Sequence, residues 1–312
     1  MRARPSEVAE AGNEGQIGRI LLLGFLATVV GASESAPGPR VLRVDSSLVL
    51  ISATVVDRSD RFVPGLRKND FRLFEGGVPQ EIVSLSAEDA PLSAAIVFDA
   101  SGSMADSIPM AGQALREFLN TANPADEFSL VTVRSHPQLS LPFVSDPEDV
   151  LHCLGGVRGG GQTALLDSVY MAAGHVRRGR HTRKAMLVIS DGEDNNSRYT
   201  ERELLDALRE MDVTVYSIGV GIRGATGVGI LGELAAATGG RYFEAWSPKD
   251  LPGIMKKIDI RQQYVLGYSP EPLRADGKYH RVELRLASQA RERHLRAFAR
   301  PGYYAPLLEA AR

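Results

Sequence analysis

The central part of the chain alternates short apolar runs with stretches of helical periodicity. The apolar runs are bounded by glycine, proline or polar residues and predict strands, the longest of them buried on both faces of a sheet. The predicted strands are residues 94–98, 127–133, 138–143, 184–191, 213–220 and 241–244. The predicted helices are residues 105–120, 164–177, 200–211, 231–237 and 248–259. Because the two kinds of element alternate, the pattern predicts a doubly wound, mostly parallel α/β sheet.

On both sides of this unit the pattern changes to one that predicts β-strands. These strands are residues 41–56, 70–79 and 81–85 before the unit, and 263–268, 279–286 and 295–299 after it. Neither group is long enough to close a sandwich by itself. Our hypothesis is that residues 41–88 pair with residues 262–304 in one small all-β sandwich. The predicted domains are an N-terminal β segment (37–90), an inserted α/β domain (91–261) and a C-terminal β segment (262–312).

The N-terminal region holds an apolar stretch, residues 20–32, that follows Arg19. It is shorter than the ~20 residues that a membrane-spanning helix needs, and Val30-x-Ala32 is an acceptable cleavage pattern. The residues before it are not net positive, which departs from a usual signal peptide. We predict residues 1–36 to be a signal peptide or an N-terminal anchor, so that the protein is periplasmic, at the cell surface or secreted. Contact with a membrane is expected only through this segment.

Composition narrows the function classes. The apolar fraction of 44% and the charged fraction of 24% are ordinary for a globular protein. The net charge of -2 and the lack of a basic tract give no support for nucleic-acid binding. Cys153 is the single cysteine, so no internal disulfide can form and the fold must depend on its core.

Candidate chemistry is concentrated where predicted strands end. The run Ser93-Ala-Ala-Ile-Val-Phe-Asp99-Ala-Ser101-Gly-Ser103 passes from an apolar strand to an acid and two hydroxyls. A glycine-rich loop then presents Thr163, and a second apolar strand ends at Asp191. In open α/β sheets ligands bind beyond the carboxyl ends of the strands. Carboxylate and hydroxyl oxygens there suit a hard divalent cation.

Taken together, Asp99-x-Ser101-x-Ser103, Thr163 and Asp191 match the metal-ion-dependent adhesion site, and residues 91–261 resemble the von Willebrand factor A domain family. The resemblance implies Mg²⁺, with Mn²⁺ or Ca²⁺ as alternatives, held at these five residues. It also implies a non-enzymatic, adhesion-type module, in which an acidic side chain of a protein partner completes the metal coordination. The expected rim of the site is Gly102, Met104, Gly161, Gln162, Glu193 and Asp194. The layout, with its terminal Pro301-Gly-Tyr-Tyr304, also resembles bacterial exported proteins of this type.

Other functions stay open at this point. Asp99 could be the nucleophile of a metal-dependent phosphatase or hydrolase, although haloacid-type enzymes need a second acid where this chain has Ser101. The site could instead hold a metal only for stability, or its residues could be ordinary turn residues and caps. Gly219-Val-Gly221-Ile-Arg-Gly224 fits a dinucleotide-binding pattern, but it comes late in the alternation. The last helix, predicted at 248–259, runs toward the sandwich and allows a hinge near Ile260. Partner identity and oligomeric state are not given by the sequence.

Overall fold

A computed structural model describes residues 48–307 apart from 222–224, 256, 259, 261 and 273–275. The predicted leader, residues 1–36, and the first part of the strand predicted at 41–56 lie outside the described residues. Within the described part, no helix is long and apolar enough to cross a membrane.

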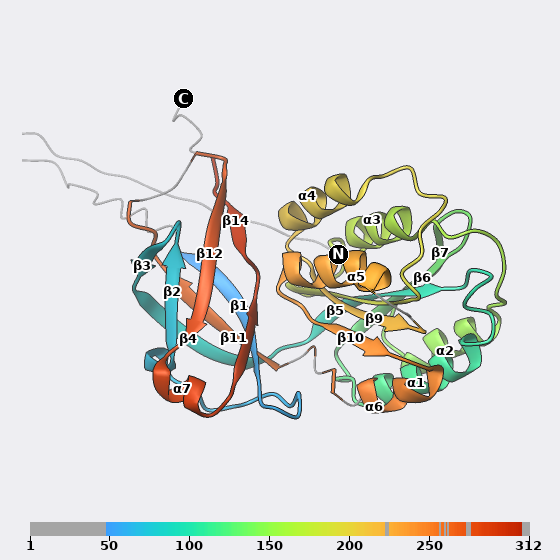
Figure 1. The fold of residues 1–312 in the computed structure, drawn as a ribbon, viewed down its shortest axis with the longest axis horizontal. Helices are drawn as coiled ribbons and strands as arrows, with labels where there is room; N and C mark the ends of the chain where they lie inside the picture. The colour runs from blue at the N-terminus through green and yellow to red at the C-terminus, as the bar shows by residue number, and fades with distance from the viewer. Residues whose placement is uncertain are drawn as a thin grey trace, which may run out of the picture. The chain divides into compact units, whose positions relative to one another are not determined.

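The central unit is a six-stranded sheet in the order β10-β9-β8-β5-β6-β7 (Figure 1). All neighbouring strands are parallel except β7, which runs antiparallel to β6. The bounds are β5 Leu92–Asp99, β6 Glu127–Val133, β7 Gln138–Val144, β8 Arg183–Ser190, β9 Thr214–Val220 and β10 Tyr242–Ala245. This arrangement confirms the predicted doubly wound, mostly parallel sheet.

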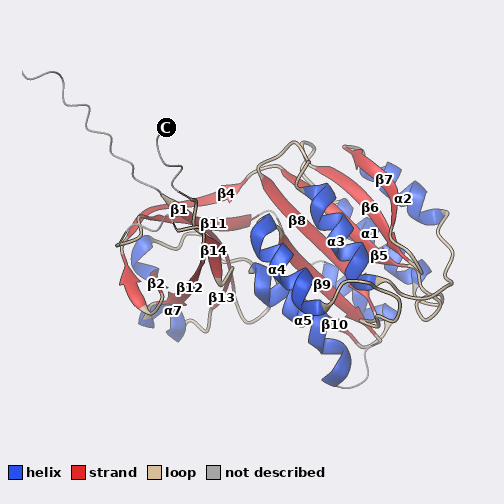
Figure 2. Cartoon of the chain, turned by 90° about the horizontal axis from the view of Figure 1, so that it is seen from above, coloured by secondary structure: helices blue, strands red, loops and turns tan. Residues whose placement is uncertain are grey.

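Helices cover both faces of this sheet, as Figures 1 and 2 show. The bounds are α1 Ile108–Leu119, α2 Pro147–Gly155, α3 Leu165–Val176, α4 Glu201–Met211, α5 Ala225–Thr238 and α6 Leu251–Met255. Ile96 and Phe98 of β5 share a core with α1, α2 and α6. Ala95 and Val97, which point to the other face, share a core with α3, α4 and α5. Because side chains alternate along a strand, a strand covered on both faces must be apolar throughout.

The helix predicted at 248–259 is shorter in the structure than predicted. Its first turn is a 3₁₀ turn, η2 Pro248–Asp250, and the α-helix that follows ends at Met255. Pro252 and Gly253 both lie in this short helix and disfavour a longer one, since proline lacks an N–H and glycine costs backbone entropy. Helix α2 was not predicted. Its start is marked by Asp146, whose carboxylate accepts a hydrogen bond from Glu148 N at 2.9 Å.

The two ends of the chain form two four-stranded sheets, in the orders β13-β1-β11-β4 and β14-β12-β2-β3. Each sheet contains strands from before and after the α/β unit, as the fold prediction expected. The strands before it are β1 Val49–Val56, β2 Phe71–Glu75, β3 Val78–Gln80 and β4 Ile82–Asp89, with η1 Lys68–Asp70 between the first two. Those after it are β11 Gln262–Tyr268, β12 Tyr279–Leu286, β13 Arg296–Ala299 and β14 Gly302–Tyr304, with α7 Ser288–Glu292. Tyr264 and Tyr268 of β11 are buried between the two sheets.

The sandwich meets the α/β unit at the turn between α5 and β10. Gly239 there has φ +76°, and a Cβ on it would come within 2.2 Å of Arg300 N. Next to it, the buried Arg241 donates to the carboxylate of Asp60, which lies between β1 and η1. Glycine is therefore required at 239 by backbone conformation and by space.

We expect Gly239→Ala to lower the free energy of unfolding by about 2 kcal/mol, because it combines a strained φ with an overpacked contact. Gly174→Ala is the matched control. Gly174 lies in α3, and a Cβ there meets nothing within 4 Å, so this change should raise stability by about 0.5–1 kcal/mol. Urea denaturation of both variants measures the difference. Equal stabilities would contradict the close contact at Gly239.

Candidate metal site

Asp99 ends β5, whose eight residues are all buried, and its own side chain is 0% exposed. Its Oδ1 accepts a hydrogen bond from Ser101 N at 2.9 Å, and its Oδ2 accepts one from Ser190 Oγ at 2.6 Å. Burial raises the pKa of the Asp99 carboxyl. The hydrogen bonds from Ser190 and Ser101 oppose this rise, and the charge of Asp191 adds to it. The carboxylate is thus held in place at a position where negative charge is poorly compensated.

The turn after Asp99 brings two hydroxyls together. Ser101 Oγ and Ser103 Oγ lie 3.1 Å apart. Ser101 is buried, with 1% exposed, whereas Ser103 is exposed. The pair therefore lies at the boundary between the core and the surface, at the carboxyl edge of the sheet.

The glycine-rich loop is joined to this turn by backbone hydrogen bonds. Gly160 N donates to Ala100 O at 3.0 Å, and Gly102 N donates to Gly161 O at 3.2 Å. Gly161 has φ +85°, and a Cβ on it would come within 2.9 Å of Ser135 Oγ. The loop can follow this path only with glycine at that position, and it leads directly to Thr163, which is buried.

The third loop, between β8 and α4, holds Thr163 through its backbone. Thr163 N donates to Asn195 Oδ1 at 2.9 Å. Thr163 O accepts hydrogen bonds from Asn195 N and Asn196 N, both at 3.0 Å. Asp167, in the first turn of α3, accepts two further bonds from the same loop, from Arg198 N at 2.9 Å and Tyr199 N at 3.0 Å. Three segments that are distant in sequence thus form one connected set of loops.

Asp191 is half-buried and close enough to Asp99 to raise the pKa of its carboxyl. Its Oδ1 accepts a hydrogen bond from Glu193 N at 3.1 Å. Together with the contacts above, this places Asp99, Ser101, Ser103, Thr163 and Asp191 on adjoining loops at the carboxyl edge of the sheet. Among the rim residues, Gly102, Gly161, Gln162 and Glu193 are exposed.

One rim prediction needs correction. Met104 is only 1% exposed and packs in the core with α1, so its side chain is not available to a partner. Asp194 is exposed, as a rim residue must be, and it also supports α3: its Oδ1 accepts hydrogen bonds from Leu165 N at 2.8 Å, at the start of the helix, and from Ser197 Oγ at 2.6 Å. It satisfies one of the N–H groups that a helix N-terminus leaves free.

Three residues that support the site were not predicted. Ser190 donates to Asp99, Asn195 accepts from Thr163, and Ser135 Oγ accepts from Gln162 N at 3.0 Å. Ser190 could have been noticed as a small hydroxyl residue at the end of an apolar strand, directly before Asp191. Asn195 and Ser135 carry no comparable signal, because their partners lie about thirty residues away in sequence.

The donor set fits a small, hard cation. Ligands on adjacent corners of an octahedron with bonds of ~2.0–2.1 Å are about 3 Å apart, close to the 3.1 Å between Ser101 Oγ and Ser103 Oγ. A cation here would also compensate the buried charge of Asp99. In the described part of the chain, no three His, Cys, Asp or Glu side chains gather at one point. A cation would therefore depend on hydroxyl oxygens, which favours Mg²⁺ or Mn²⁺ over metals that need thiolate or imidazole ligands.

Comparison with known proteins agrees with this geometry. Residues 94–193, about a third of the chain, match the family model of the von Willebrand factor type A domain. No curated protein matched the chain. A solved structure of proximal thread matrix protein 1 from mussel byssus, with a zinc-occupied MIDAS motif, has 21% identity and a TM-score of 0.50. The match covers 58% of this chain and 49% of that one, so it spans about half the length of the mussel protein.

Two bacterial structures are also similar. A von Willebrand factor type A protein from Catenulispora acidiphila has 13% identity and a TM-score of 0.47, over 84% of this chain and 74% of its own. An aerotolerance-related membrane protein from Bacteroides fragilis has 17% identity and a TM-score of 0.45, over 55% of this chain and 98% of its own. Residues 94–193 match the von Willebrand factor type A domain in sequence, and the sheet and helices that contain them have its fold, which often mediates metal-dependent protein interactions.

Proposed function

We propose that the chain is a divalent-cation-dependent protein-binding module, exported from the cell, whose partner contributes an acidic side chain to the metal. Ser101, Ser103 and Thr163 would hold the ion through their hydroxyls, and Asp99 and Asp191 would balance its charge. Bound at this edge, Mg²⁺ supplies an electrophilic centre for a carboxylate of the partner. The observation that carries the proposal is the buried carboxylate of Asp99, followed directly by two hydroxyl oxygens 3.1 Å apart.

The position of Asp99 argues against the hydrolase alternative. A nucleophilic carboxylate must reach its substrate, but Asp99 is 0% exposed. Both of its oxygens already accept hydrogen bonds, from Ser101 N and Ser190 Oγ. These contacts orient the group and hold it below the surface, which disfavours attack on a substrate. We therefore propose binding without a catalytic step.

Titration of the full chain with a metal tests the proposal. Saturable binding of Mg²⁺ or Mn²⁺ is expected by isothermal calorimetry, and Thr163→Ala should weaken it by about a hundredfold, since losing a group that only orients a metal ligand already costs about 10–100-fold. The variant should still fold, because Thr163 is held by its backbone N–H and C=O rather than by its hydroxyl. Ca²⁺ and Zn²⁺ belong in the same series, since the similar mussel structure holds zinc.

Thr182→Ala is the control for this titration. Thr182 is exposed and directly precedes β8, at the opposite end of the strand from Asp191, so its loss should leave metal affinity unchanged. If the wild-type chain binds no divalent cation, or if both variants bind like the wild type, the proposed site is wrong.

A further inference from the structure

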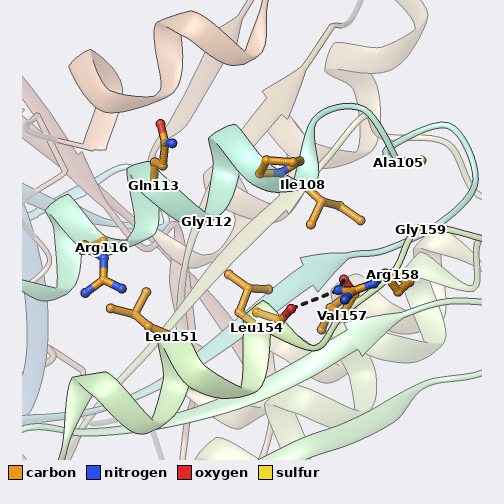
Figure 3. A pocket seen from close by; sticks show the side chains of 12 residues that line it. Ala105, Ile108, Gly112, Gln113, Arg116, Leu151, Leu154, Val157, Arg158 and Gly159 are labelled. Atoms are coloured by element: carbon orange, nitrogen blue, oxygen red, sulfur yellow. Dashed lines mark hydrogen bonds between the residues drawn. The ribbon is translucent and has the colours of Figure 1, made fainter.

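A groove lies between α1 and α2, next to the candidate metal site (Figure 3). Its volume is about 430 Å³, within the ~300–1,000 Å³ range of ligand pockets. Ile108, Leu151 and Leu154 give it an apolar floor. Figure 3 shows Arg116 at one end and Arg158 at the other. Among the described residues that line the groove, these two are the charged ones.

The groove exists because glycines stand where the two helices face each other. Gly112 of α1 lies against Leu154: a Cβ at Gly112 would be 3.5 Å from Leu154 Cδ2. Gly155, the last residue of α2, has open space in front of it, since a Cβ there would meet nothing within 4 Å. Larger side chains would close the gap between the helices, so the apolar floor stays accessible to a ligand.

One end of the groove is shared with the candidate metal site. Ala105 and Gly159 both line the groove, and a Cβ at Gly159 would come within 2.6 Å of Ala105 Cα. Ala105 follows Ser103 by two residues, and Gly159 precedes Gly161 by two. The two loops that would present the metal ligands therefore also form this end of the groove. A chain segment that reaches the metal can continue into the groove without a break.

The charges at the two ends indicate what the groove would bind. Arg158 uses Nη1 to donate to Gly155 O and Val157 O, and a guanidinium has five N–H donors in all. Arg116 pairs with Glu148 at 2.8 Å, but both side chains are more than half exposed. Such an exposed pair contributes little and can be exchanged for a partner's carboxylate at small cost. An apolar floor between two arginines is complementary to an aliphatic side chain flanked by acids.

We infer that the α1–α2 groove binds the partner's chain next to the acid that ligates the metal, taking an aliphatic side chain on its floor and a second acid at Arg116. The inference rests on the proposed function, because the first acid of the segment is the one on the metal. It assigns the groove as the surface that selects among acidic partners. Metal coordination alone would accept any accessible carboxylate, whereas the groove requires a particular sequence beside it.

A displayed library of random peptides, screened against the full chain, tests both the proposed function and the inference about the groove. Peptides about 12 residues long reach roughly 40 Å when extended, enough to span the site and the groove. The library is captured in Mg²⁺ and released with EDTA, and the affinity of each released peptide is then measured for the variants. Gly155→Phe places an aromatic ring in the groove from an unstrained helical position. Gly174→Phe is the matched control, because Gly174 is a helical glycine with no atom within 4 Å of its Cβ and lies in α3, on the other face of the sheet.

The expected peptides carry an acid followed by an aliphatic residue and a second acid. Gly155→Phe should weaken their binding about tenfold or more while Mg²⁺ affinity and the Gly174→Phe control stay unchanged. Arg116→Glu should weaken the same peptides, and a lysine in place of their second acid should restore binding. If no EDTA-released peptide appears, the proposed function fails and this inference with it.

If EDTA-released peptides bind Gly155→Phe as tightly as the wild type, the metal site stands and the groove inference alone is overturned. A second copy of the chain as the occupant would also overturn it, and would show as self-association in sedimentation that Gly155→Phe abolishes.

Discussion

Asp99→Asn is expected to abolish the rise in Tm that Mg²⁺ causes, without lowering the Tm measured in chelator. Asp99 carries a negative charge that is 0% exposed and lies near the charge of Asp191. Burying a charge without a counter-charge costs stability, so neutralising it should leave the metal-free protein equally stable or more stable. The wild type should gain about 2.7 kcal/mol when Mg²⁺ is present at a hundred times its Kd, and the variant should gain nothing.

Asp126→Asn is the control. It shows whether loss of the Mg²⁺-dependent rise in Tm is specific to Asp99 or follows the replacement of any buried aspartate. Asp126 is 1% exposed and lies at the opposite end of the sheet, where it accepts hydrogen bonds from Leu92 N at 2.9 Å and Asn123 N at 2.8 Å. Its replacement should lower Tm equally in Mg²⁺ and in chelator. Scanning calorimetry of both variants under both conditions gives the comparison. A loss of stability for Asp99→Asn in chelator would mean that Asp99 is a structural residue.

Asp60→Asn is expected to lower the free energy of unfolding by about 3 kcal/mol, as for a buried ion pair that loses one partner. Arg241 is 6% exposed and donates to the Asp60 carboxylate, and its guanidinium lies 4.5 Å from the ring centroid of Phe243 and 5.2 Å from that of Phe298. Arg296 donates to the same carboxylate. Removing the negative charge leaves the buried Arg241 without compensation. Asparagine is the suitable replacement because Asp60 has φ +64°, which asparagine tolerates.

Glu283→Gln is the control for this second prediction. The Glu283–Arg285 pair is about half exposed on both sides, so its loss should cost less than about 1 kcal/mol. Urea denaturation of the two variants gives the comparison. The double variant Asp60→Asn, Arg241→Met should recover part of the loss, since replacing both charges of a buried pair is tolerated better than removing one. Equal costs for Asp60→Asn and Glu283→Gln would show that the Asp60–Arg241 pair does not stabilise the contact between the sandwich and the α/β unit.

A few residues stabilise the contact between the sandwich and the α/β unit, and the hinge predicted near Ile260 would have to open that contact. Arg183 Nη2 donates to Ile260 O at 2.8 Å, and Arg241 and Gly239 join the sandwich close by. The hinge stays a prediction. If it exists, motion about it must break these contacts, and Asp60→Asn should make the junction easier to open. The exported location, the acidic protein partner and the residue bounds of the domains also stay predictions.

The sequence by itself determined the elements whose pattern is local. The strand predicted at 94–98 lies inside β5, Leu92–Asp99, because a strand covered on both faces must be apolar along its length. The positions of Asp99 and Asp191 followed from the same pattern, since the carboxyl ends of parallel strands lie at one edge of the sheet. The helix predicted at 248–259 was too long, because Pro252 and Gly253, which disfavour a helix, lie inside it.

Only the tertiary structure decided which groups support the site and what lies beside it. Ser190 reaches Asp99 across 91 residues, and Asp194 caps a helix 29 residues away. Met104 turned inward because the apolar core beneath α1 was available to it. The groove between α1 and α2 depends on glycines in separate helices that face each other only after folding. Contacts of this kind depend on side-chain packing between distant segments, for which one sequence carries no periodic signal.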